Sequence, residues 1–313
     1  MLSLTFLGTS AARPTIERSV SAMALQREGE TLLFDCGEGT QRQMMRYGVG
    51  FTLRDVFFTH FHSDHILGIT GLARTFGLQG RTDPLCLWGP RGAARVLNQA
   101  LELGVERTPY PIEIHEVAAG DRLARTGYDL EVIAADHGGG AVSYVLREHQ
   151  RLGRFDPEKA HALGIPEGPL WGRIHKGETV EWEVAVEGGP PVRRSAGPPD
   201  LVGPARSGRV LAISGDTRPT AALVEAAAGA DLLVHEATFS EDERDRALET
   251  RHSTAREAAQ VALAAGVRRL VLTHLSARFS TAWQELLDEA CAVFPATAVA
   301  KDGMVVEVPF VDA

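Results

Sequence analysis

The residues best suited to chemistry lie close together in the six-residue segment HFHSDH at 60–65. It holds four side chains that can bind a metal, more than a structural zinc site takes from one segment. His60 and His62 can project to the same side of an extended loop and bind one ion, while Asp64 and His65 turn toward a second. Imidazole and carboxylate ligands without thiolate favour zinc, with manganese or iron as substitutes. A histidine cluster without metal is the alternative, and the density of ligands argues against it.

Metal-binding side chains also occur at the points where several predicted strands end. In open α/β sheets ligands gather at the carboxyl ends of strands, so these side chains should converge on one site. The residues at these strand ends are His60, His137, Asp216, His235 with Glu236, and His274. We expect His137 to complete the ligands of the first ion, His274 to complete those of the second, and Asp216 to bridge both. A helix cap before Pro219 is the alternative role for Asp216.

Short apolar runs separated by turn signals predict the strands that must carry this site. Near the N-terminus they predict strands over residues 2–7, 21–26, 31–34 and 56–59, with a hairpin at 28–30. Helices are predicted over residues 40–47 and 91–103, each followed by a glycine. Strands and helices alternate again after residue 208. The pattern predicts an α/β fold in which two halves pack as a layered sandwich.

The composition limits the partners and the compartment. A formal net charge of −9 over 313 residues argues against coating nucleic acid through bulk electrostatics, but it leaves room for a local basic patch. No apolar run reaches the roughly 18 residues of a membrane span, and no signal peptide is evident. The three cysteines are isolated, which argues against a disulfide framework and favours a reducing cytoplasm.

The pattern His-x-His-x-Asp-His, followed by a distal histidine, an aspartate and a last histidine, resembles the metallo-β-lactamase superfamily. That resemblance implies a four-layered αββα sandwich with two zinc ions at one edge. The superfamily hydrolyses lactams, thioesters, lactones, phosphodiesters and RNA, so membership alone leaves the substrate open.

Further features resemble the bacterial short form of the tRNase Z family, which processes the 3′ ends of tRNA. One is the segment HEAT at 235–238 followed by HST at 252–254. The resemblance implies that Glu236 orients His252, that His252 protonates the departing ribose oxygen, and that Asp64 accepts a proton. Capping of neighbouring helices is the alternative role for Glu236 and His252.

The Gly/Pro-rich segment ALGIPEGPLW at 162–171, with KGETV at 176–180, resembles the flexible arm of that family, which clasps tRNA bound to the partner subunit of a homodimer. The resemblance implies a single metallo-β-lactamase domain over residues 1–313 with an inserted, protruding tRNA-binding arm at about 150–180. From Arg151 to Gly177, five Lys or Arg accompany three Asp or Glu, and this local +2 suits contact with phosphates. An ordinary solvated insertion is the alternative. Residues from about 180 to 206 are interpreted as a loop expansion of unknown role.

Residues 9–20 resemble the family's N-terminal loop, whose Pro-x-Lys-x-Arg-Asn pattern is linked to sensing the CCA end of mature tRNA. Pro14 and Arg18 match that pattern, whereas Ile16 and Ser19 replace its lysine and asparagine. Rejection of CCA-bearing tRNA, and the balance of endonuclease and exonuclease activity, therefore stay open.

Taken with the resemblance, these residues predict a zinc-dependent endoribonuclease that removes the 3′ trailer from precursor tRNA. The products would be a tRNA with a 3′-hydroxyl and a trailer with a 5′-phosphate. Two Zn²⁺ per subunit are expected, with Mn²⁺ as a functional substitute and no membrane partner. The alternatives are a hydrolase of a small phosphodiester or sulfate ester, an exonuclease-leaning tRNA processor, and a metal-bearing RNA-binding protein without turnover.

Overall fold

The computed structural model describes residues 1–105, 107–185 and 189–311, which form two compact units. The larger unit consists of Met1–Arg147 and Arg209–Phe310, and the smaller unit consists of Glu148–Gly208 with Val311. Within the described ranges, no helix has the length and apolar content that crossing a membrane requires.

The first sheet of the larger unit has seven strands in the order β16-β1-β2-β3-β4-β5-β6. They are β1 (Leu2–Gly8), β2 (Ala22–Arg27), β3 (Glu30–Phe34), β4 (Asp55–Phe57), β5 (Leu85–Pro90), β6 (Ile112–Val117) and β16 (Val305–Glu307). Strands β3 to β6 are parallel, so their carboxyl ends meet at one edge. The predicted hairpin between β2 and β3 is confirmed, and its turn residues Glu28 and Gly29 have φ values of 46° and 90°.

The second sheet has seven strands in the order β15-β14-β13-β12-β9-β8-β7. They are β7 (Arg122–Arg125), β8 (Tyr128–Ala134), β9 (Val142–Glu148), β12 (Val210–Ile213), β13 (Leu232–Glu236), β14 (Leu270–Thr273) and β15 (Thr297–Val299). Strands β12 to β15 are parallel, and β9 runs antiparallel to β12. The carboxyl ends of β12, β13 and β14 therefore also meet at one edge.

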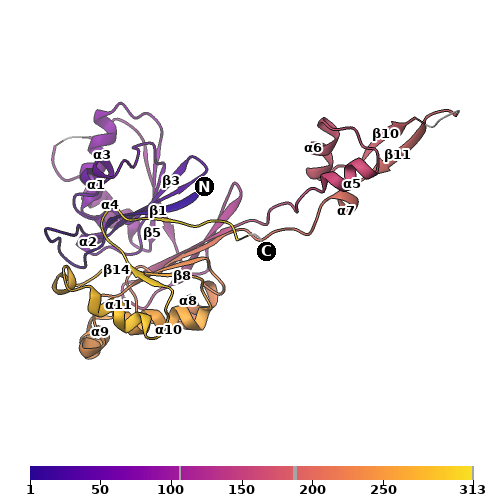
Figure 1. Ribbon diagram of the computed structural model, residues 1–313. Helices are drawn as coiled ribbons and strands as arrows, with labels where there is room; N and C mark the ends of the chain where they lie inside the picture. Colours follow the sequence, from indigo (N-terminus) through magenta and orange to yellow (C-terminus); the bar gives the residue numbers. More distant parts are fainter. Residues whose placement is uncertain (106, 186–188, 312–313) are drawn as a thin grey trace. The chain divides into compact units, whose positions relative to one another are not determined.

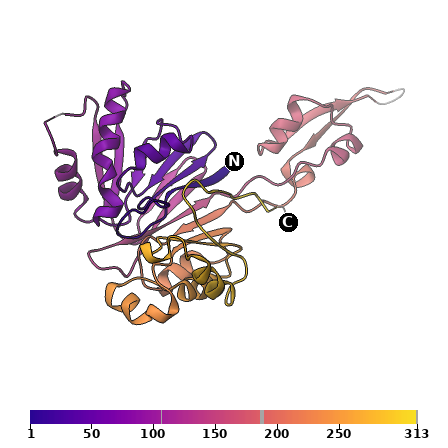
Figure 2. The ribbon, with the colours of Figure 1, turned by 60° about the vertical axis from the view of Figure 1, so that its left-hand side comes forward.

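Helices cover the outer face of each sheet, as Figures 1 and 2 show. The covering helices are α1 (Thr40–Arg46), α3 (Gly68–Leu78) and α4 (Ala93–Leu101) on the first sheet, and α8 (Ala221–Ala226), α10 (Ala255–Ala265) and α11 (Gln284–Cys291) on the second. Helices α2 (Ser63–Ile66) and α9 (Arg244–Thr250), with the 3₁₀ turns η1 (Glu241–Glu243) and η2 (Ala277–Phe279), lie in the connections. The predicted helices over 40–47 and 91–103 are thus confirmed as α1 and α4, within about two residues at each end.

The larger unit has three apolar cores, and these define its layers. One lies between the sheets, where Tyr144 of β9 packs against Phe34 and Phe57 of the first sheet with ring centroids 5.7 and 5.6 Å apart. The second lies between the first sheet and α1, α3 and α4, and the third lies between the second sheet and α8, α10 and α11. The predicted four-layered αββα sandwich is confirmed.

The smaller unit has its own apolar core and its own elements. These are α5 (Pro157–Ala162), α6 (Pro169–His175), β10 (Val180–Val184), β11 (Val192–Ala196) and α7 (Pro198–Leu201). Strands β10 and β11 pair antiparallel, so part of the stretch interpreted as a loop expansion at 180–206 is regular structure. In β10 the buried side chains of Val180 and Trp182 alternate with the exposed side chains of Glu181 and Glu183. This alternation is typical of a strand with one buried face.

Candidate metal centre and catalytic site

The residues predicted to bind metal lie together just beyond the ends of the strands. The first sheet supplies them through the loop after β4 and through α2, and the second sheet supplies them through the loops after β8, β12 and β14. One group contains His60, His62, His137 and Asp216, and a second contains Asp64, His65 and His274. Within each group the ligand atoms lie within 4.8 Å of one another. The structure thus brings all seven residues together.

A single oxygen atom of Asp216 lies between the two groups. Its Oδ2 is 3.6 Å from His60 Nε2 and 3.7 Å from His137 Nε2 in the first group. In the second group it is 3.3 Å from the Nε2 atoms of both His65 and His274. This is the position predicted for a bridging carboxylate.

Acceptors on the protein fix the orientation of the ligand imidazoles. His65 Nδ1 donates to Asp35 Oδ2 at 2.8 Å, and His137 Nδ1 donates to the carbonyl oxygen of Arg251 at 2.7 Å. Because a carboxylate and a carbonyl group only accept, each Nδ1 carries a proton, so the neutral form of either ring has its lone pair on Nε2. Both rings therefore direct Nε2, the nitrogen that a metal would bind, toward the cluster.

Two threonines hold His60 and His274 in the same way. Thr59 Oγ1 donates to Asp35 Oδ2 at 3.0 Å and lies 3.1 Å from His60 Nδ1. Thr238 Oγ1 donates to Glu236 Oε2 at 2.6 Å and lies 2.9 Å from His274 Nδ1. Since each hydroxyl hydrogen is already donated, each hydroxyl oxygen accepts from the imidazole Nδ1, and Nε2 of each ring lies toward Asp216 in the cluster.

The chemistry of this cluster fits a divalent metal. His60 Nε2 is buried and has no hydrogen-bond partner within the described ranges. Burial, reinforced by neighbouring His65, holds the pKa of His60 well below its usual value, so the ring is neutral as a metal ligand must be. Burial opposes the charge of Asp216, but His274, His65 and His60 hold the pKa of this carboxyl well below its usual range. Neutral imidazoles and ionised carboxylates are zinc ligands.

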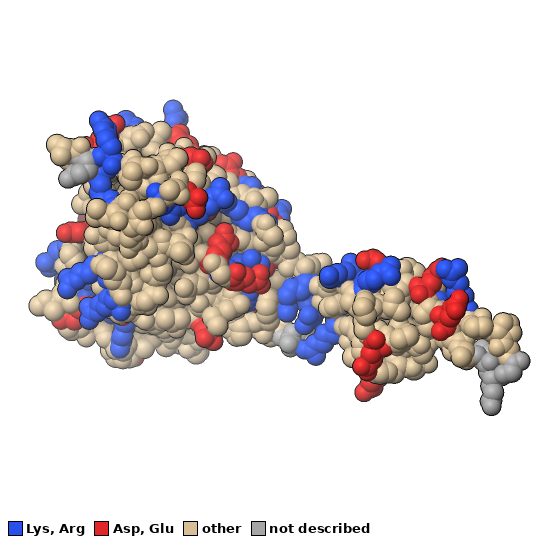
Figure 3. Space-filling model, turned by 90° about the horizontal axis from the view of Figure 1, so that it is seen from above, with Lys and Arg blue, Asp and Glu red and all other residues tan. Residues whose placement is uncertain are grey.

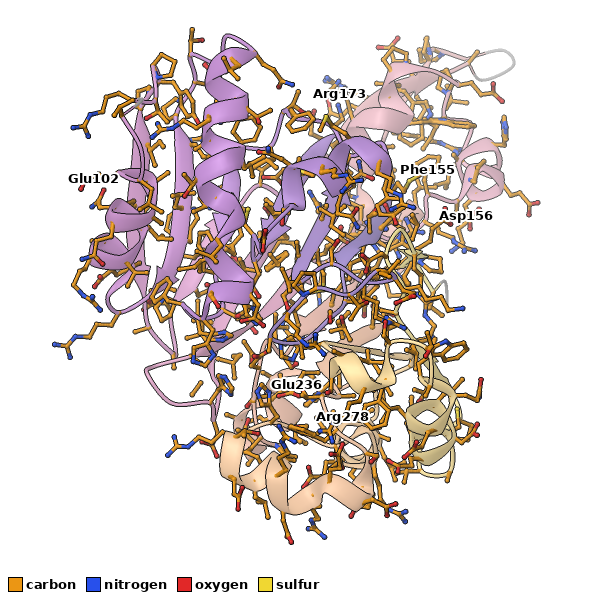
Figure 4. The ribbon with its side chains drawn as sticks, turned by 90° about the vertical axis from the view of Figure 1, so that its left-hand side faces the viewer. Glu102, Phe155, Asp156, Arg173, Glu236 and Arg278 are labelled. Atoms are coloured by element: carbon orange, nitrogen blue, oxygen red, sulfur yellow. The ribbon has the colours of Figure 1, made fainter. Side chains whose placement is uncertain are left out.

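The predicted pair of Glu236 and His252 is formed beside the cluster. Glu236 ends β13 and is buried inside the larger unit (Figure 4). Its Oε1 accepts from His252 Nδ1 at 2.8 Å. Burial alone would lower the pKa of His252, but Glu236 and Asp216 raise it to about 9. The imidazole of His252 is therefore protonated at neutral pH and can donate a proton.

The turn that carries His252 is held by an ion pair. Arg218 Nη1 donates to the carbonyl oxygen of His252 at 2.5 Å and to Glu257 Oε2 at 2.7 Å. Glu257 Oε2 also accepts from the N–H of Thr254 at 3.0 Å, which completes a capping box at the start of α10. Because Arg218 lies two residues after Asp216, the loop that supplies a ligand also fixes the backbone of His252.

The N-terminal loop at 9–20 reaches the cluster through its backbone. The N–H of Ala12 donates to Asp64 Oδ2 at 2.7 Å, and Ala12 has a φ of 59°. Arg18 is buried, and its Nη1 donates to the carbonyl oxygen of Ala300 at 2.6 Å, whereas Ile16 is 99% exposed. The loop is thus anchored inside the protein while part of it faces solvent.

Several residues that support the site were not predicted, among them Asp35, Thr238 and Arg218. Asp35 directly follows β3, so the rule of strand ends that found the ligands was sufficient to find it. Thr238 and Arg218 act through their neighbours, and no local pattern marks such a role. Conversely, His235 precedes Glu236 on β13 but lies outside the cluster, because successive side chains of a strand point to opposite faces, and its Nδ1 donates to the carbonyl oxygen of Glu236 at 2.8 Å.

Comparison with known proteins identifies the family. The model described as a beta-lactamase superfamily domain matches residues 200–275, and the model described as anti-Pycsar protein Apyc1 matches residues 2–151. Ribonuclease Z of Gemmatimonas aurantiaca is 57% identical over 308 residues, which cover 98% of this chain and 96% of that protein. The chain belongs to the ribonuclease Z family. Ribonuclease Z of Myxococcus xanthus is 54% identical over 313 residues, covering 100% of this chain and 99% of that protein.

A solved structure agrees with this assignment. Human tRNase Z, short form, has a TM-score of 0.69 and 26% identity, with 98% of this chain and 100% of that chain covered. As a ribonuclease Z, the chain is a metal-dependent hydrolase and a tRNA 3′-end-processing endonuclease, and precursor tRNA is its substrate. The buried His/Asp cluster is the metal-binding cluster of the metallo-β-lactamase fold. The predicted family, fold and activity are confirmed.

Proposed function

We propose that the cluster binds two Zn²⁺ ions, one in each group of ligands, with Asp216 shared between them. The observation that carries this proposal is the position of Asp216 Oδ2, which lies 3.3–3.7 Å from imidazole nitrogens of both groups. A carboxylate oxygen in that position suits the bridging ligand of a two-metal site. The other ligands would be His60, His62 and His137 for one ion, and Asp64, His65 and His274 for the other. Mn²⁺ is expected to substitute, since it accepts the same types of ligand.

The catalytic roles follow from the groups around the cluster. When bound, the two ions supply Lewis-acid stabilisation of the phosphodiester and make water more acidic. Asp64 is the proton acceptor for the attacking water, and the N–H of Ala12 holds its carboxylate in place. His252, oriented by Glu236, donates its proton to the departing ribose 3′-oxygen. The products are a tRNA with a 3′-hydroxyl and a trailer with a 5′-phosphate.

We assign the smaller unit as a flexible arm that binds tRNA. Its part from 151 to 177 carries the local charge of +2, but Glu148–Gly208 as a whole has eight Lys or Arg and nine Asp or Glu. Figure 3 likewise shows both signs of charge interspersed on the face that it presents. Binding would therefore depend on where the basic side chains lie along the RNA backbone rather than on bulk attraction.

A homodimer and a cytoplasmic location complete the proposal. The arm of one subunit would clasp tRNA bound to its partner, as the resemblance to the bacterial short form implies. The three cysteines are free thiols, which fits a reducing compartment.

One cleavage assay tests the catalytic proposal. A 3′-extended precursor tRNA, with or without an encoded CCA, is incubated with the protein in Zn²⁺ or Mn²⁺, and both new ends are mapped. We expect one cut after the discriminator nucleotide, with a 3′-hydroxyl and a 5′-phosphate. No cut there in either metal would overturn the proposal. The matched variant Asp216→Asn should lose both cleavage and part of the Zn²⁺ that the wild type holds at this cluster, as measured by native mass spectrometry of both proteins.

A further inference from the structure

A second cluster of potential metal ligands lies on the first sheet, outside the ribonuclease Z site. Cys86 of β5 is directly opposite Glu113 of β6 in the parallel register, and His115 lies two residues further along β6. Residues two apart on a strand point to the same face, so the three side chains share one side of the sheet. Their ligand atoms all lie within 4.8 Å of one another.

The distances within this cluster suit one small cation. Cys86 Sγ lies 3.7 Å from Glu113 Oε2, and the same oxygen lies 3.6 Å from His115 Nε2. Tetrahedral zinc, with bonds of about 2.3 Å to sulfur and about 2.0–2.2 Å to nitrogen or oxygen, holds such atoms roughly 3.3–3.6 Å apart. Ligand atoms around Asp216 in the ribonuclease Z cluster show similar separations of 3.3–3.7 Å.

Neighbouring side chains hold the cluster in place. Trp88 stacks on the ring of His115 with centroids 4.1 Å apart and an interplanar angle of 20°. Asp55, on the next strand, accepts from Trp88 Nε1 at 2.6 Å and pairs with Arg125 at 3.1 Å. Asp55 is therefore occupied as an acceptor, and it fixes the indole against which His115 packs.

A cation can reach the cluster from solvent, and its binding requires Cys86 to lose the thiol proton. The side chains of Glu113 and His115 are 49% and 38% exposed, so a cation can reach them from solvent. Burial raises the pKa of the Cys86 thiol, whereas the neighbouring Arg54 guanidinium favours the thiolate. A metal that binds sulfur displaces the thiol proton, and its affinity then falls at low pH.

We propose that Cys86, Glu113 and His115 form a mononuclear site for a thiophilic divalent cation such as Zn²⁺, with water as the fourth ligand. Such an ion joins the edge strand β6 to β5. None of the three residues belongs to the ribonuclease Z cluster, so the proposal stands or falls independently of the two-zinc assignment.

Cobalt gives a readout that separates this site from the catalytic one. The full-length protein is stripped of metal, reloaded with Co²⁺, and examined for thiolate-to-cobalt charge-transfer absorption in the near ultraviolet. The ribonuclease Z cluster contains only imidazole and carboxylate ligands. We therefore expect the absorption in the wild type. Cys86→Ser should lose this absorption and should bind one Co²⁺ per chain fewer than the wild type. Cys36→Ser and Cys291→Ser are the matched controls and should keep it.

Two results would overturn the proposal: no thiolate absorption at saturating Co²⁺, or absorption that persists in Cys86→Ser. Because Cys86 is buried, a second variant guards against misfolding. Glu113→Gln with His115→Gln changes only partly exposed side chains and keeps the thiol, and it should weaken Co²⁺ binding at this site about tenfold or more. Unchanged affinity in this variant would also contradict a three-ligand site.

Discussion

Arg218 connects the metal-binding loop to the turn that carries the proposed general acid. Its guanidinium, whose side chain is 12% exposed, is shared between the carbonyl oxygen of His252 and the carboxylate of Glu257. Charge-assisted hydrogen bonds in such a setting are strong and directional. We therefore treat Arg218 as a positioning residue, which sets the direction in which the imidazole of His252 points without touching substrate itself.

Replacing Arg218 by methionine should slow tRNA cleavage more than hydrolysis of an activated ester. We expect Arg218→Met to lower kcat for precursor tRNA by about 10- to 100-fold, because the ribose oxygen needs a proton as it leaves. Hydrolysis of bis(4-nitrophenyl) phosphate should fall much less, since 4-nitrophenolate leaves without protonation. Arg244→Met is the control, because Arg244 reaches the same Glu257 at 3.8 Å from an exposed position.

Equal losses on the two substrates would show that Arg218 does not act through His252. Arg218→Met also removes the closer of the two cations beside the buried carboxylate of Glu257 and leaves only Arg244 at 3.8 Å, so it should lower the free energy of unfolding by up to about 3–5 kcal/mol. The double variant Arg218→Met with Glu257→Gln removes that charge, so it should recover stability while keeping the substrate-selective defect.

Thr238 should tune the affinity of the cluster for metal through one hydroxyl group. Thr238→Val keeps the shape of the side chain but removes the acceptor for His274 Nδ1, which lies at 2.9 Å. We expect about 10- to 100-fold weaker Zn²⁺ binding, measured by competition with a chromophoric chelator. Thr238→Ser, which keeps the hydroxyl group, should stay near the wild type. Equal affinity in the valine and serine variants would rule out this role.

At the scale of elements, the sequence predicts the strands better than the contacts between distant residues. The ligands could be found because each follows an apolar run, and parallel strands bring their ends together. Strand β10 was missed because the glycines and prolines around it conceal the alternation of Val180 and Trp182 with glutamates. The pairing of Arg218 with Glu257 joins residues 39 positions apart, and such a contact depends on how α10 packs.

The core of the smaller unit should depend on Trp182. This side chain is 7% exposed and packs among the few apolar residues that the unit contains. Trp182→Ala should lower the free energy of unfolding of this unit by about 3–5 kcal/mol, which is a large part of the stability of a unit of this size. We expect protease cleavage confined to residues 148–208, with the larger unit intact by mass spectrometry. Val192→Ala, at a half-exposed position on β11, is the matched control. Resistance equal to that of the control would mean that Trp182 does not hold the unit together.

At the scale of the whole molecule, the larger unit should fold without the smaller one. Arg147 of β9 pairs with Val210 of β12, so the chain leaves and re-enters the second sheet at adjacent positions. Replacing residues 149–207 by a short glycine linker should keep the fold and the hydrolysis of bis(4-nitrophenyl) phosphate. Cleavage of precursor tRNA should fall sharply through a raised KM. Loss of both activities, with an intact fold by circular dichroism, would contradict the assignment of the smaller unit as a tRNA-binding arm.

The metal cluster also joins the two sheets, so removing the metal should destabilise the larger unit as a whole. His60, His62, Asp64 and His65 come from the first sheet, whereas His137, Asp216 and His274 come from the second. A metal present at about 1,000 times its Kd raises the free energy of unfolding by roughly 4 kcal/mol. For a unit of this size that corresponds to a rise in Tm of roughly 10 °C. We expect a fall of that order on chelation, reversed by Zn²⁺. The measurement is made in Cys86→Ser to exclude the second site, and adding Asp216→Ala should abolish most of the shift. A full shift in that double variant would place the stabilising metal elsewhere.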